Sequence, residues 1–322
     1  MRRLILLAAS VVALALPAAA GARPSALPHG AKPSCGFLTG TPVAVSHVVV
    51  IVMENHSYAD LIGRRGSAVA ARAPYINGLK RACGLATNYH SLTHPSLPNY
   101  IAMVAGSNGG ITTDCTSCTS RAHNLFRRLG GTGGTWRVYA ESMPSRCSHT
   151  STLHYLKRHN PATYFPAIRS QCASWDVPMG GASGRFATAL ARNTLPDYAM
   201  VVPNPCDDMH DCSVRTGDTW LATWVPRILQ SGDYRAGRTV VFIVWDEGEG
   251  GGYGGENCLA HLADQSCHVP ALVLSGYTAP GARSGTQFSH LSLLRTTQTL
   301  LGATPYLGAA GRAHGMGRAF GL

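Results

Sequence analysis

Acidic residues are scarce in this chain, which has 16 Asp and Glu against 27 Lys and Arg and a formal net charge of +11. A basic surface attracts anions, such as phosphorylated substrates, anionic lipid or cell-wall polymer, and nucleic acid. The basic residues are dispersed, without an arginine-rich arm or a basic strip interleaved with aromatic residues. This dispersal disfavours nucleic-acid binding and leaves the other anions as candidate ligands.

Long apolar runs are absent beyond the N-terminus. Met1-Arg-Arg precedes an apolar run over Leu4–Leu16, and the small residues of 17–22 follow it. The run is too short to span a bilayer and the small residues suit cleavage, so residues 1–22 are predicted to be a secretory signal peptide. Its removal lowers the net charge to about +9. We therefore expect an exported, extracellular protein without stable membrane insertion.

Two common hydrolase motifs are also missing. The sequence has neither G-x-S-x-G, the nucleophile elbow of α/β-hydrolases, nor H-E-x-x-H, a zinc-protease motif. The stretch 250–255 formally matches G-x-G-x-x-G, but no helical pattern follows it and Asn257-Cys258 closes a loop instead. A dinucleotide site is therefore rejected.

Ten cysteines in an exported chain predict disulfides. Cys115-Thr-Ser-Cys118 could also be a redox motif or half of a zinc site, but no second matching pair completes a zinc site, so a structural disulfide is favoured. Proximity in the sequence predicts the pairs Cys115/Cys118, Cys206/Cys212, Cys258/Cys267 and Cys147/Cys172, and leaves Cys35 for Cys83.

Strand and helix patterns alternate along the chain. Apolar, mostly β-branched runs over residues 43–53, 136–140, 197–202, 238–245 and 268–275 are typical of buried strands. Helices are predicted over 73–83, 122–129, 219–229 and 291–301. No repeat or linker divides the chain, so we expect a Pro/Gly-rich leader over 23–42 and one α/β domain with a mainly parallel sheet over 43–322.

Ser96 stands at the start of another predicted helix. Pro95 favours an extended entry, Pro98 fits only a first helical turn, and an apolar face then continues to Gly106. One interpretation is that Ser96 is an N-cap whose hydroxyl accepts a hydrogen bond from an orphan amide. The other is that Ser96 is a nucleophile, because helix amides and the helix dipole favour an alkoxide and an arriving phosphate.

Carboxylates come directly after the predicted buried strands. The packing of a core strand gives no reason for an acidic residue at this position. Parallel strands present such ends at one edge of a sheet, where open α/β sheets carry their sites. Hard oxygen ligands beside a serine favour a metal-activated nucleophile. An acyl-transfer triad from Ser96, His210 and an acid would leave Glu54 and Glu247 unexplained. The polar groups at strand ends and helix starts are Glu54/Asn55, Asp208/His210, Asp246/Glu247, Ser96 and His290.

Five motifs, in order, resemble the phosphoesterase family, which contains bacterial secreted acid phosphatases and phosphatidylcholine-type phospholipases C within the alkaline phosphatase-like superfamily. The resemblance covers residues 45–302 and is strongest to actinobacterial secreted acid phosphatases described as phosphatidylinositol-3-phosphatases. It implies a three-layer α/β/α sandwich. The motifs are Met53-Glu-Asn-His-Ser57, Thr93-His-Pro-Ser-Leu-Pro-Asn-Tyr100, Pro203-Asn with Asp208-Met-His-Asp211, Trp245-Asp-Glu247 and Phe288-Ser-His-Leu-Ser-Leu-Leu-Arg295.

The resemblance also implies roles for individual residues. Ser96 matches the nucleophile, and His210 and His290 match catalytic positions lining the phosphate pocket. Zinc-dependent relatives have Asp-His where this chain has Asp246-Glu247, which favours calcium or magnesium over zinc as the divalent metal, or one metal ion instead of two. The implied metal ligands are Glu54, Asn55, Ser96, Asp246 and Glu247, and the implied substrate-binding residues are His159, Asp208 and Asn204.

These expectations describe a secreted phosphomonoesterase of the acid phosphatase type that forms a phosphoseryl intermediate. Its substrates would be phosphoinositides or other phosphorylated small molecules. One alternative is a phospholipase C acting on diesters, although such relatives tend to carry extra C-terminal domains. A second alternative is a non-catalytic basic protein that binds anionic polymer. The sequence makes no prediction of oligomeric state.

Overall fold

The computed structural model describes residues 34–249 and 257–322. The predicted signal peptide, most of the predicted leader and the glycine-rich stretch 250–255 lie outside the described residues. Among the residues that are described, no helix has the length and apolar character needed to cross a membrane. The described residues belong to one compact unit, and the end of the leader is part of it, because the Gly36 and Leu38 amides donate to the carbonyls of Ser275 and Gly276.

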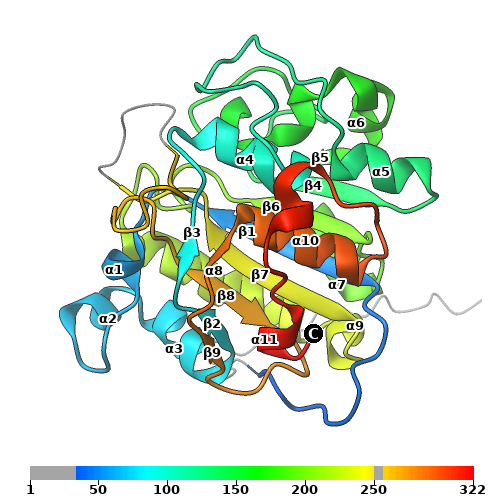
Figure 1. Ribbon diagram of the computed structural model, residues 1–322. Coiled ribbons are helices and arrows are strands. Elements are labelled where there is room, and N and C mark those ends of the chain that lie inside the picture. The colour runs from blue at the N-terminus through cyan, green and yellow to red at the C-terminus, as the bar shows by residue number, and fades with distance from the viewer. Residues whose placement is uncertain (1–33, 250–256) are drawn as a thin grey trace, which may run out of the picture. The chain divides into compact units, whose positions relative to one another are not determined.

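The unit is built on an eight-stranded sheet with the order β5-β4-β6-β1-β7-β8-β2-β9 (Figure 1). Neighbouring strands from β5 to β7 run parallel, whereas β8 is antiparallel to both β7 and β2. The predicted mainly parallel α/β sheet is therefore confirmed. The strands are β1 (His47–Met53), β2 (Gly84–Ala86), β4 (Trp136–Ala140), β5 (Asp176–Pro178), β6 (Tyr198–Val202), β7 (Thr239–Trp245), β8 (Ala271–Leu274) and β9 (Arg283–Ser284), and a separate parallel pair joins β3 (Tyr89–His90) to β10 (Phe288–Ser289).

Helices cover both faces of the sheet. On one face α4 packs against α5 and α10, and on the other α8 packs against α3 and α7 (Figure 1). The helices are α1 (Tyr58–Leu61), α2 (Ala68–Arg72), α3 (Pro74–Ala82), α4 (Ser96–Ala105), α5 (Leu125–Gly131), α6 (Arg169–Trp175), α7 (Arg185–Arg192), α8 (Val214–Leu229), α9 (Gly232–Arg235), α10 (His290–Leu300) and α11 (Gly317–Phe320). Short 3-10 turns span Lys157–His159, Pro161–Tyr164, Pro166–Ile168 and Gly308–Arg312.

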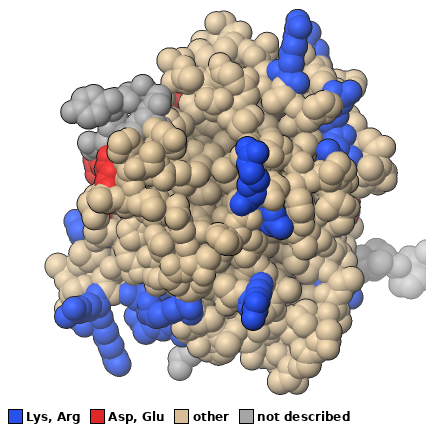
Figure 2. Space-filling view, viewed as in Figure 1, with Lys and Arg blue, Asp and Glu red and all other residues tan. Residues whose placement is uncertain are grey.

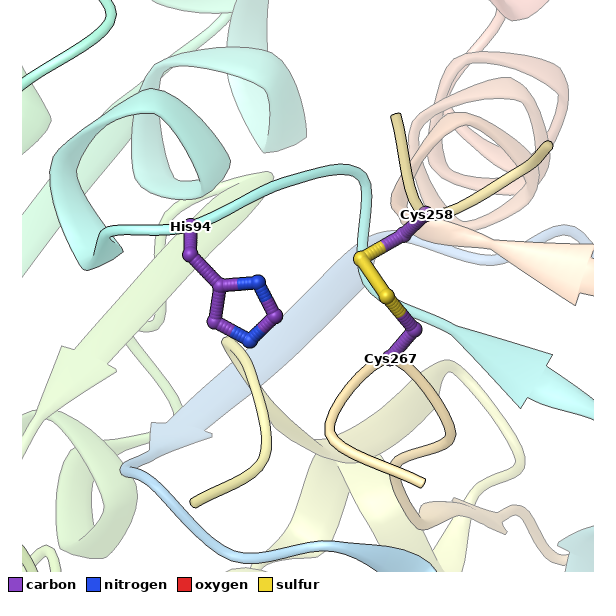
Figure 3. A group of neighbouring side chains, drawn as sticks. All are labelled: His94, Cys258 and Cys267. Atoms are coloured by element: carbon purple, nitrogen blue, oxygen red, sulfur yellow. A yellow bond between two sulfur atoms is a disulfide. The ribbon is translucent and has the colours of Figure 1, made fainter. Parts of the chain in front are cut away.

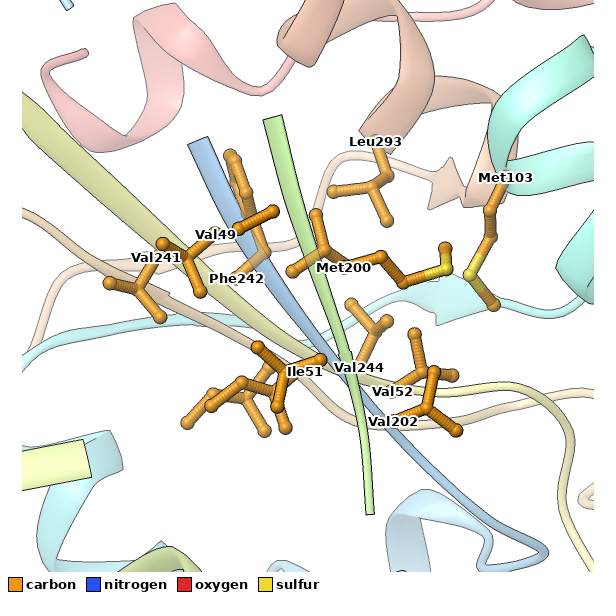
Figure 4. Packing of buried hydrophobic residues seen from close by; sticks show 14 of the residues in the cluster. Val49, Ile51, Val52, Met103, Met200, Val202, Val241, Phe242, Val244 and Leu293 are labelled. Carbon is orange, nitrogen blue, oxygen red and sulfur yellow. The ribbon is translucent and has the colours of Figure 1, made fainter. Parts of the chain in front are cut away.

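The hydrophobic core lies on both faces of the central strands, against α4 and α10 on one side and α3, α7 and α8 on the other. Met103 of α4 and Leu293 of α10 approach Met200 of β6 in Figure 4. Strands β1 and β7 are buried along nearly their whole length, which explains their β-branched composition. They pair in register from His47 opposite Thr239 to Met53 opposite Trp245. The two strands therefore end side by side at the same edge of the sheet.

Basic side chains are dispersed over the face drawn in Figure 2, where acidic side chains are few. This agrees with the sequence, in which no stretch gathers the basic residues.

Two helix starts differ from the sequence predictions. Pro95 occupies the N-cap of α4 and Ser96 is the first helical residue, and among the described residues the Ser96 hydroxyl contacts Glu54 and Glu247 and accepts from no amide. Helix α8 begins at Val214, not at Thr219, because the Ser213 hydroxyl accepts a hydrogen bond from the Thr216 amide. Asp218, which directly precedes the predicted helix start at residue 219, is instead buried within the helix.

The Asp218 carboxylate caps a different helix. It accepts hydrogen bonds from the amides of Tyr75 at 3.0 Å and Ile76 at 2.8 Å, in the first turn of α3. A carboxylate at a helix N-terminus satisfies orphan amides and interacts favourably with the helix dipole. The residue therefore joins two helices on the same face of the sheet.

All five predicted disulfides are present, and the described residues include no free cysteine. Cys206–Cys212 closes the loop after β6, and Cys258–Cys267 closes the segment before β8. Cys35–Cys83 ties the end of the leader to the end of α3, and the other two bonds are Cys115–Cys118 and Cys147–Cys172.

We expect Asp176→Asn to stabilise the protein above neutral pH. Asp176 is fully buried in β5, and burial raises its pKa to about 7. Because the folded pKa exceeds the unfolded one, the carboxyl destabilises the fold as pH rises from about 4 through about 7, by on the order of 4 kcal/mol. Asparagine stays neutral, and its Oδ1 can accept the hydrogen bond that Asn160 Nδ2 donates to the Asp176 carboxylate at 2.9 Å.

Denaturant unfolding at pH 5 and pH 8 measures this difference. The variant should be the more stable protein at pH 8 and should lose that advantage at pH 5, where the Asp176 carboxyl is protonated. Equal stabilities at pH 8 would mean that Asp176 is ionised in the folded protein at no cost.

Candidate active site

Four carboxylates gather at the edge of the sheet where β1, β6 and β7 end. Glu54 follows β1, Asp246 and Glu247 follow β7, and Asp208 lies in the loop after β6. All four are buried, with exposed fractions between 0 and 6%. Asn55 adopts a left-handed backbone, and its amide donates to Asp246 Oδ1 at 3.2 Å. The predicted convergence of strand-end acids on one edge is thus what the structure contains.

Ser96 points directly at these acids. Its hydroxyl lies 3.2 Å from Glu54 Oε2 and 3.4 Å from Glu247 Oε1, within hydrogen-bonding distance of both. The first turn of α4 places it there, since Pro95 ends the extended entry and the helix begins at Ser96. Because the hydroxyl caps no amide, the N-cap interpretation of Ser96 is wrong for this structure.

Two further residues of α4 hold the same carboxylates. Asn99 donates from Nδ2 to Glu247 Oε2 at 3.2 Å, and the Tyr100 hydroxyl donates to Glu54 Oε1. Positions three and four residues apart lie on one helix face, so the side chains of Ser96, Asn99 and Tyr100 all contact the carboxylates. Asn99 and Tyr100 belong to a recognised sequence motif but were assigned no role from it, although the helical spacing could have identified them.

The N-terminus of α4 is capped by a residue from a distant loop. Asp114 Oδ1 accepts a hydrogen bond from the Leu97 amide at 2.9 Å, and Asp114 Oδ2 lies 3.4 Å from Arg158 Nε. Arg158 Nη2 also lies 3.1 Å from His210 Nε2. Asp114 was not singled out from the sequence, because it lies in a polar loop without a distinctive local pattern.

His159 lies between two of the acids. Its Nε2 is 3.4 Å from Glu54 Oε1 and its Nδ1 is 3.5 Å from Asp208 Oδ2, while its ring stacks on Tyr100 with centroids 5.3 Å apart. The ring is buried, and burial lowers its pKa well below the usual value for histidine. Contact with the four-carboxylate group supports the predicted involvement of His159 in the site.

His210 lies at the rim of the site and is only partly buried. Its amide donates to Asp208 Oδ1 at 2.8 Å, and its Nδ1 lies 2.6 Å from Asp211 Oδ1. The Cys206–Cys212 disulfide closes this loop, as expected. Oδ1 of Asp208 is therefore held by a backbone amide, whereas its Oδ2 faces the His159 ring at 3.5 Å without a hydrogen bond among the described residues.

Two predicted site residues have other contacts. His290 is fully buried, with Nε2 2.7 Å from the Asp246 carbonyl and Nδ1 3.0 Å from the Tyr89 hydroxyl. Both ring nitrogens are thus engaged with protein, so the predicted catalytic contact is corrected to a positioning contact on the Asp246 backbone. The Asn204 side chain is likewise occupied within its own loop, bonding to Asp207 and to the amides of the following turn, which corrects its predicted substrate contact.

The four carboxylates strongly perturb one another. Burial raises the pKa of Asp246 to about 6, and burial together with the charge of Asp246 raises the pKa of Glu247 to about 10. Burial, Asp246 and Asp208 raise the pKa of Glu54 well above its usual value. Several carboxylates buried in one place are costly unless a positive charge compensates them.

A divalent cation fits this arrangement. Oδ2 of Asp246 and Oδ2 of Asp208 are buried and accept no hydrogen bond from the described residues, so both are available as ligands. One ligand atom each from Glu54, His159 and His210 also lie within 4.8 Å of one another. Carboxylate oxygens are preferred ligands of hard divalent cations, and imidazole nitrogen broadens the choice of metal.

A second group of potential ligand atoms is not a metal site. His94, Cys258 and Cys267 come together beside the start of α4 (Figure 3). The two sulfur atoms are bonded to each other at 2.03 Å and supply no thiolate ligand.

Comparison with known proteins identifies the family. The family model described as "Phosphoesterase family" matches residues 67–302. The chain belongs to the phosphoesterase family. The match ends at residue 302, as expected, but begins at residue 67 and not at 45, so it includes Ser96 and the acids Asp208, Asp246 and Glu247 and leaves out the first predicted motif at residues 53–57.

Curated relatives of this phosphoesterase are named as phosphatases. It is 28% identical over 282 residues to a phosphatidylinositol-3-phosphatase of Mycobacterium tuberculosis, covering 85% of this chain and 82% of that one. It is 25% identical over 214 residues to an acid phosphatase of Aspergillus fumigatus, covering 64% of this chain and 45% of the relative. The chain thus spans less than half the length of this fungal relative. These relatives support the statement that the protein is a hydrolase acting on phosphate esters.

Solved structures confirm the expected alkaline phosphatase-like α/β sandwich. A protein of the alkaline phosphatase superfamily from Vibrio parahaemolyticus superposes with a TM-score of 0.56 at 13% identity, covering 84% of this chain and 68% of that chain. A phosphonate monoester hydrolase of Agrobacterium radiobacter superposes with a TM-score of 0.53 at 14% identity, covering 80% and 74%. At these low sequence identities, the structural similarity is evidence for a shared fold only.

Proposed function

We propose that this phosphoesterase is an exported phosphomonoesterase of the acid phosphatase type with Ser96 as its nucleophile. The observation that carries the proposal is the Ser96 hydroxyl, which caps no amide and lies between the buried carboxylates of Glu54 and Glu247. A buried hydroxyl at the first turn of a helix, beside acids that can hold a cation, has the surroundings that activate a nucleophile.

The residues of the site suggest a two-step reaction. Ser96 Oγ attacks the phosphorus atom, the ester oxygen leaves with a proton, and the resulting phosphoseryl group is hydrolysed by water. Carboxylates of Glu54, Asp246 and Glu247 would hold a divalent cation, which lowers the hydroxyl pKa and neutralises phosphoryl charge. Asn99 and Tyr100 keep Glu247 and Glu54 oriented during both steps.

The rim of the site supplies groups for the substrate. Arg158 lies beside His210 and Asp114, and its planar guanidinium can bind two phosphoryl oxygens. We keep His210 as the proposed proton donor to the leaving ester oxygen, in a substrate complex in which its Nε2 no longer accepts from Arg158 Nη2. Asp208 holds the His210 backbone, so we assign it a positioning role together with ligation of the cation.

Three more specific proposals, on the metal, on export and on the substrate, rest on separate observations. Calcium or magnesium is favoured over zinc because the strand-end ligands are carboxylates. Export is supported by the predicted signal peptide and by five disulfides, which persist in oxidising compartments. Phosphoinositides are proposed as candidate substrates because a relative is named phosphatidylinositol-3-phosphatase.

The test compares p-nitrophenyl phosphate with bis-p-nitrophenyl phosphate from acid to neutral pH, with and without a chelator. We expect phosphate release from the monoester, loss of that release with chelator, and recovery when magnesium or calcium is returned. Preference for the diester would favour the phospholipase C alternative. A folded, metal-supplemented protein that turns over neither substrate would favour the alternative of a non-catalytic protein that binds anionic polymer.

A further inference from the structure

A cavity that is distinct from the four-carboxylate site lies at the β4–β5 end of the sheet. Its volume is about 610 Å³, within the range of pockets for small ligands. Four arginines line it: Arg137 of β4, Arg146 of the following loop, and Arg185 and Arg192 of α7. We call it the arginine groove. Among the described residues, no acidic side chain lines it, and it shares no residue with the candidate active site.

The charges of the arginine groove are not compensated within the described part of the chain. None of its four guanidinium groups forms an ion pair there, whereas Arg158 and Arg238 each pair with a carboxylate. Arg137 donates to the Ser174 carbonyl at a long distance of 3.4 Å, which leaves its positive charge in place. Like charges gathered around one hollow repel one another, and a bound anion would relieve that repulsion.

The start of α7 adds a further positive element to the same cavity. Gly184 lines the groove and occupies the N-cap of α7, which has no side-chain cap. A Cβ atom at this position would lie 2.5 Å from Gly180 Cα and 2.6 Å from the Met179 carbonyl oxygen, so serine or aspartate is excluded. The Phe186 amide already donates to the Met179 carbonyl at 3.2 Å, so the remaining first-turn amides and the positive end of the helix dipole are left to an acceptor from outside the helix.

We propose that the arginine groove binds a multiply charged phosphate group and acts as a second, non-catalytic anion site. Phosphate is the class that the groove favours, because guanidinium groups bind its oxygens in pairs and a helix N-terminus adds amide donors. The phosphate can belong to a phosphoinositide headgroup or to a soluble polyphosphorylated compound. The proposal goes beyond the phosphatase activity and does not depend on it.

Calorimetric titration with methylenediphosphonate, whose P–C–P bond resists hydrolysis, tests the proposal on the full chain in the presence of chelator. The groove variant is Arg146→Gln with Arg192→Gln. The matched control is Arg64→Gln with Arg65→Gln, an exposed pair that removes the same charge from a different loop. We expect at least about tenfold weaker binding in the groove variant, unchanged binding in the control, and unchanged turnover of p-nitrophenyl phosphate in both.

Vesicle sedimentation identifies the source of the phosphate. Retention on phosphatidylcholine vesicles that contain a phosphatidylinositol monophosphate, lost in the groove variant, would assign the site to a lipid headgroup. Diphosphonate binding without retention would assign it to a soluble compound. The proposal is overturned if the groove variant binds both probes as the unmodified protein does, or if the control pair weakens binding equally. Melting temperatures and the charge-conserving pair Arg146→Lys with Arg192→Lys show whether a loss reflects misfolding.

Discussion

Replacement of Ser96 by alanine is expected to reduce phosphate release by on the order of 10³-fold or more while the protein remains folded. The loss of activity follows from removing the attacking oxygen. The fold should persist because the Ser96 hydroxyl caps no amide of α4, and that role falls to Asp114. Its loss removes hydrogen bonds to Glu54 and Glu247, a change of about 1 kcal/mol in the free energy of unfolding.

Turnover of p-nitrophenyl phosphate and denaturant unfolding of the same preparation measure the two effects. Ser91→Ala is a matched control, since Ser91 is equally buried and its hydroxyl faces the Cys258–Cys267 segment and not the acids. A Ser96→Ala protein that kept more than about a tenth of the activity would show direct attack by water. Mass spectrometry of acid-quenched enzyme should find phosphate on Ser96 in the unmodified protein.

Asp246→Asn is expected to remove both activity and metal binding. Its Oδ2 atom is buried without a hydrogen-bond partner among the described residues, and the other oxygen accepts from the Asn55 amide. A cation bound only to the folded state stabilises it by about 2.7 kcal/mol at a concentration of one hundred times the dissociation constant. In the unmodified protein, magnesium or calcium should therefore raise the melting temperature by several degrees.

The variant should show no such rise in melting temperature, and its turnover should fall on the order of 10³-fold. Asp197→Asn is the control, because Asp197 precedes β6 at the opposite edge of the sheet and accepts from the Thr135 amide. An Asp246→Asn protein that is still stabilised by the metal would place the cation on other residues. The melting measurement keeps this test independent of catalysis.

The central strands and the acids that follow them could be predicted from the sequence. A continuous apolar run such as 47–53 can only be buried on both faces, and parallel strands bring their ends to one edge. Glu54 and Asp246 were therefore identifiable from the pattern of residues alone. The start of α8 was missed because a local capping serine at Ser213 extends the helix upstream of its apolar face.

The supporting residues of the site were harder to predict, since they depend on tertiary contacts. Asp114 and Arg158 are separated by more than forty residues, and only the folded chain brings them together at the mouth of the site. His290 was correctly placed at a helix start, but the direction of its ring was not. A histidine at the end of a strand or helix can face the substrate or the backbone behind it, and sequence does not distinguish the two.

The order of the disulfides has a consequence for how the protein is made. Each cysteine is joined to the next one along the chain: Cys35 to Cys83, Cys115 to Cys118, Cys147 to Cys172, Cys206 to Cys212 and Cys258 to Cys267. A chain that emerges from a translocon and is oxidised as it appears joins each new cysteine to the one before it. Strictly vectorial oxidation would thus yield the native connectivity directly, without an enzyme that reshuffles disulfides.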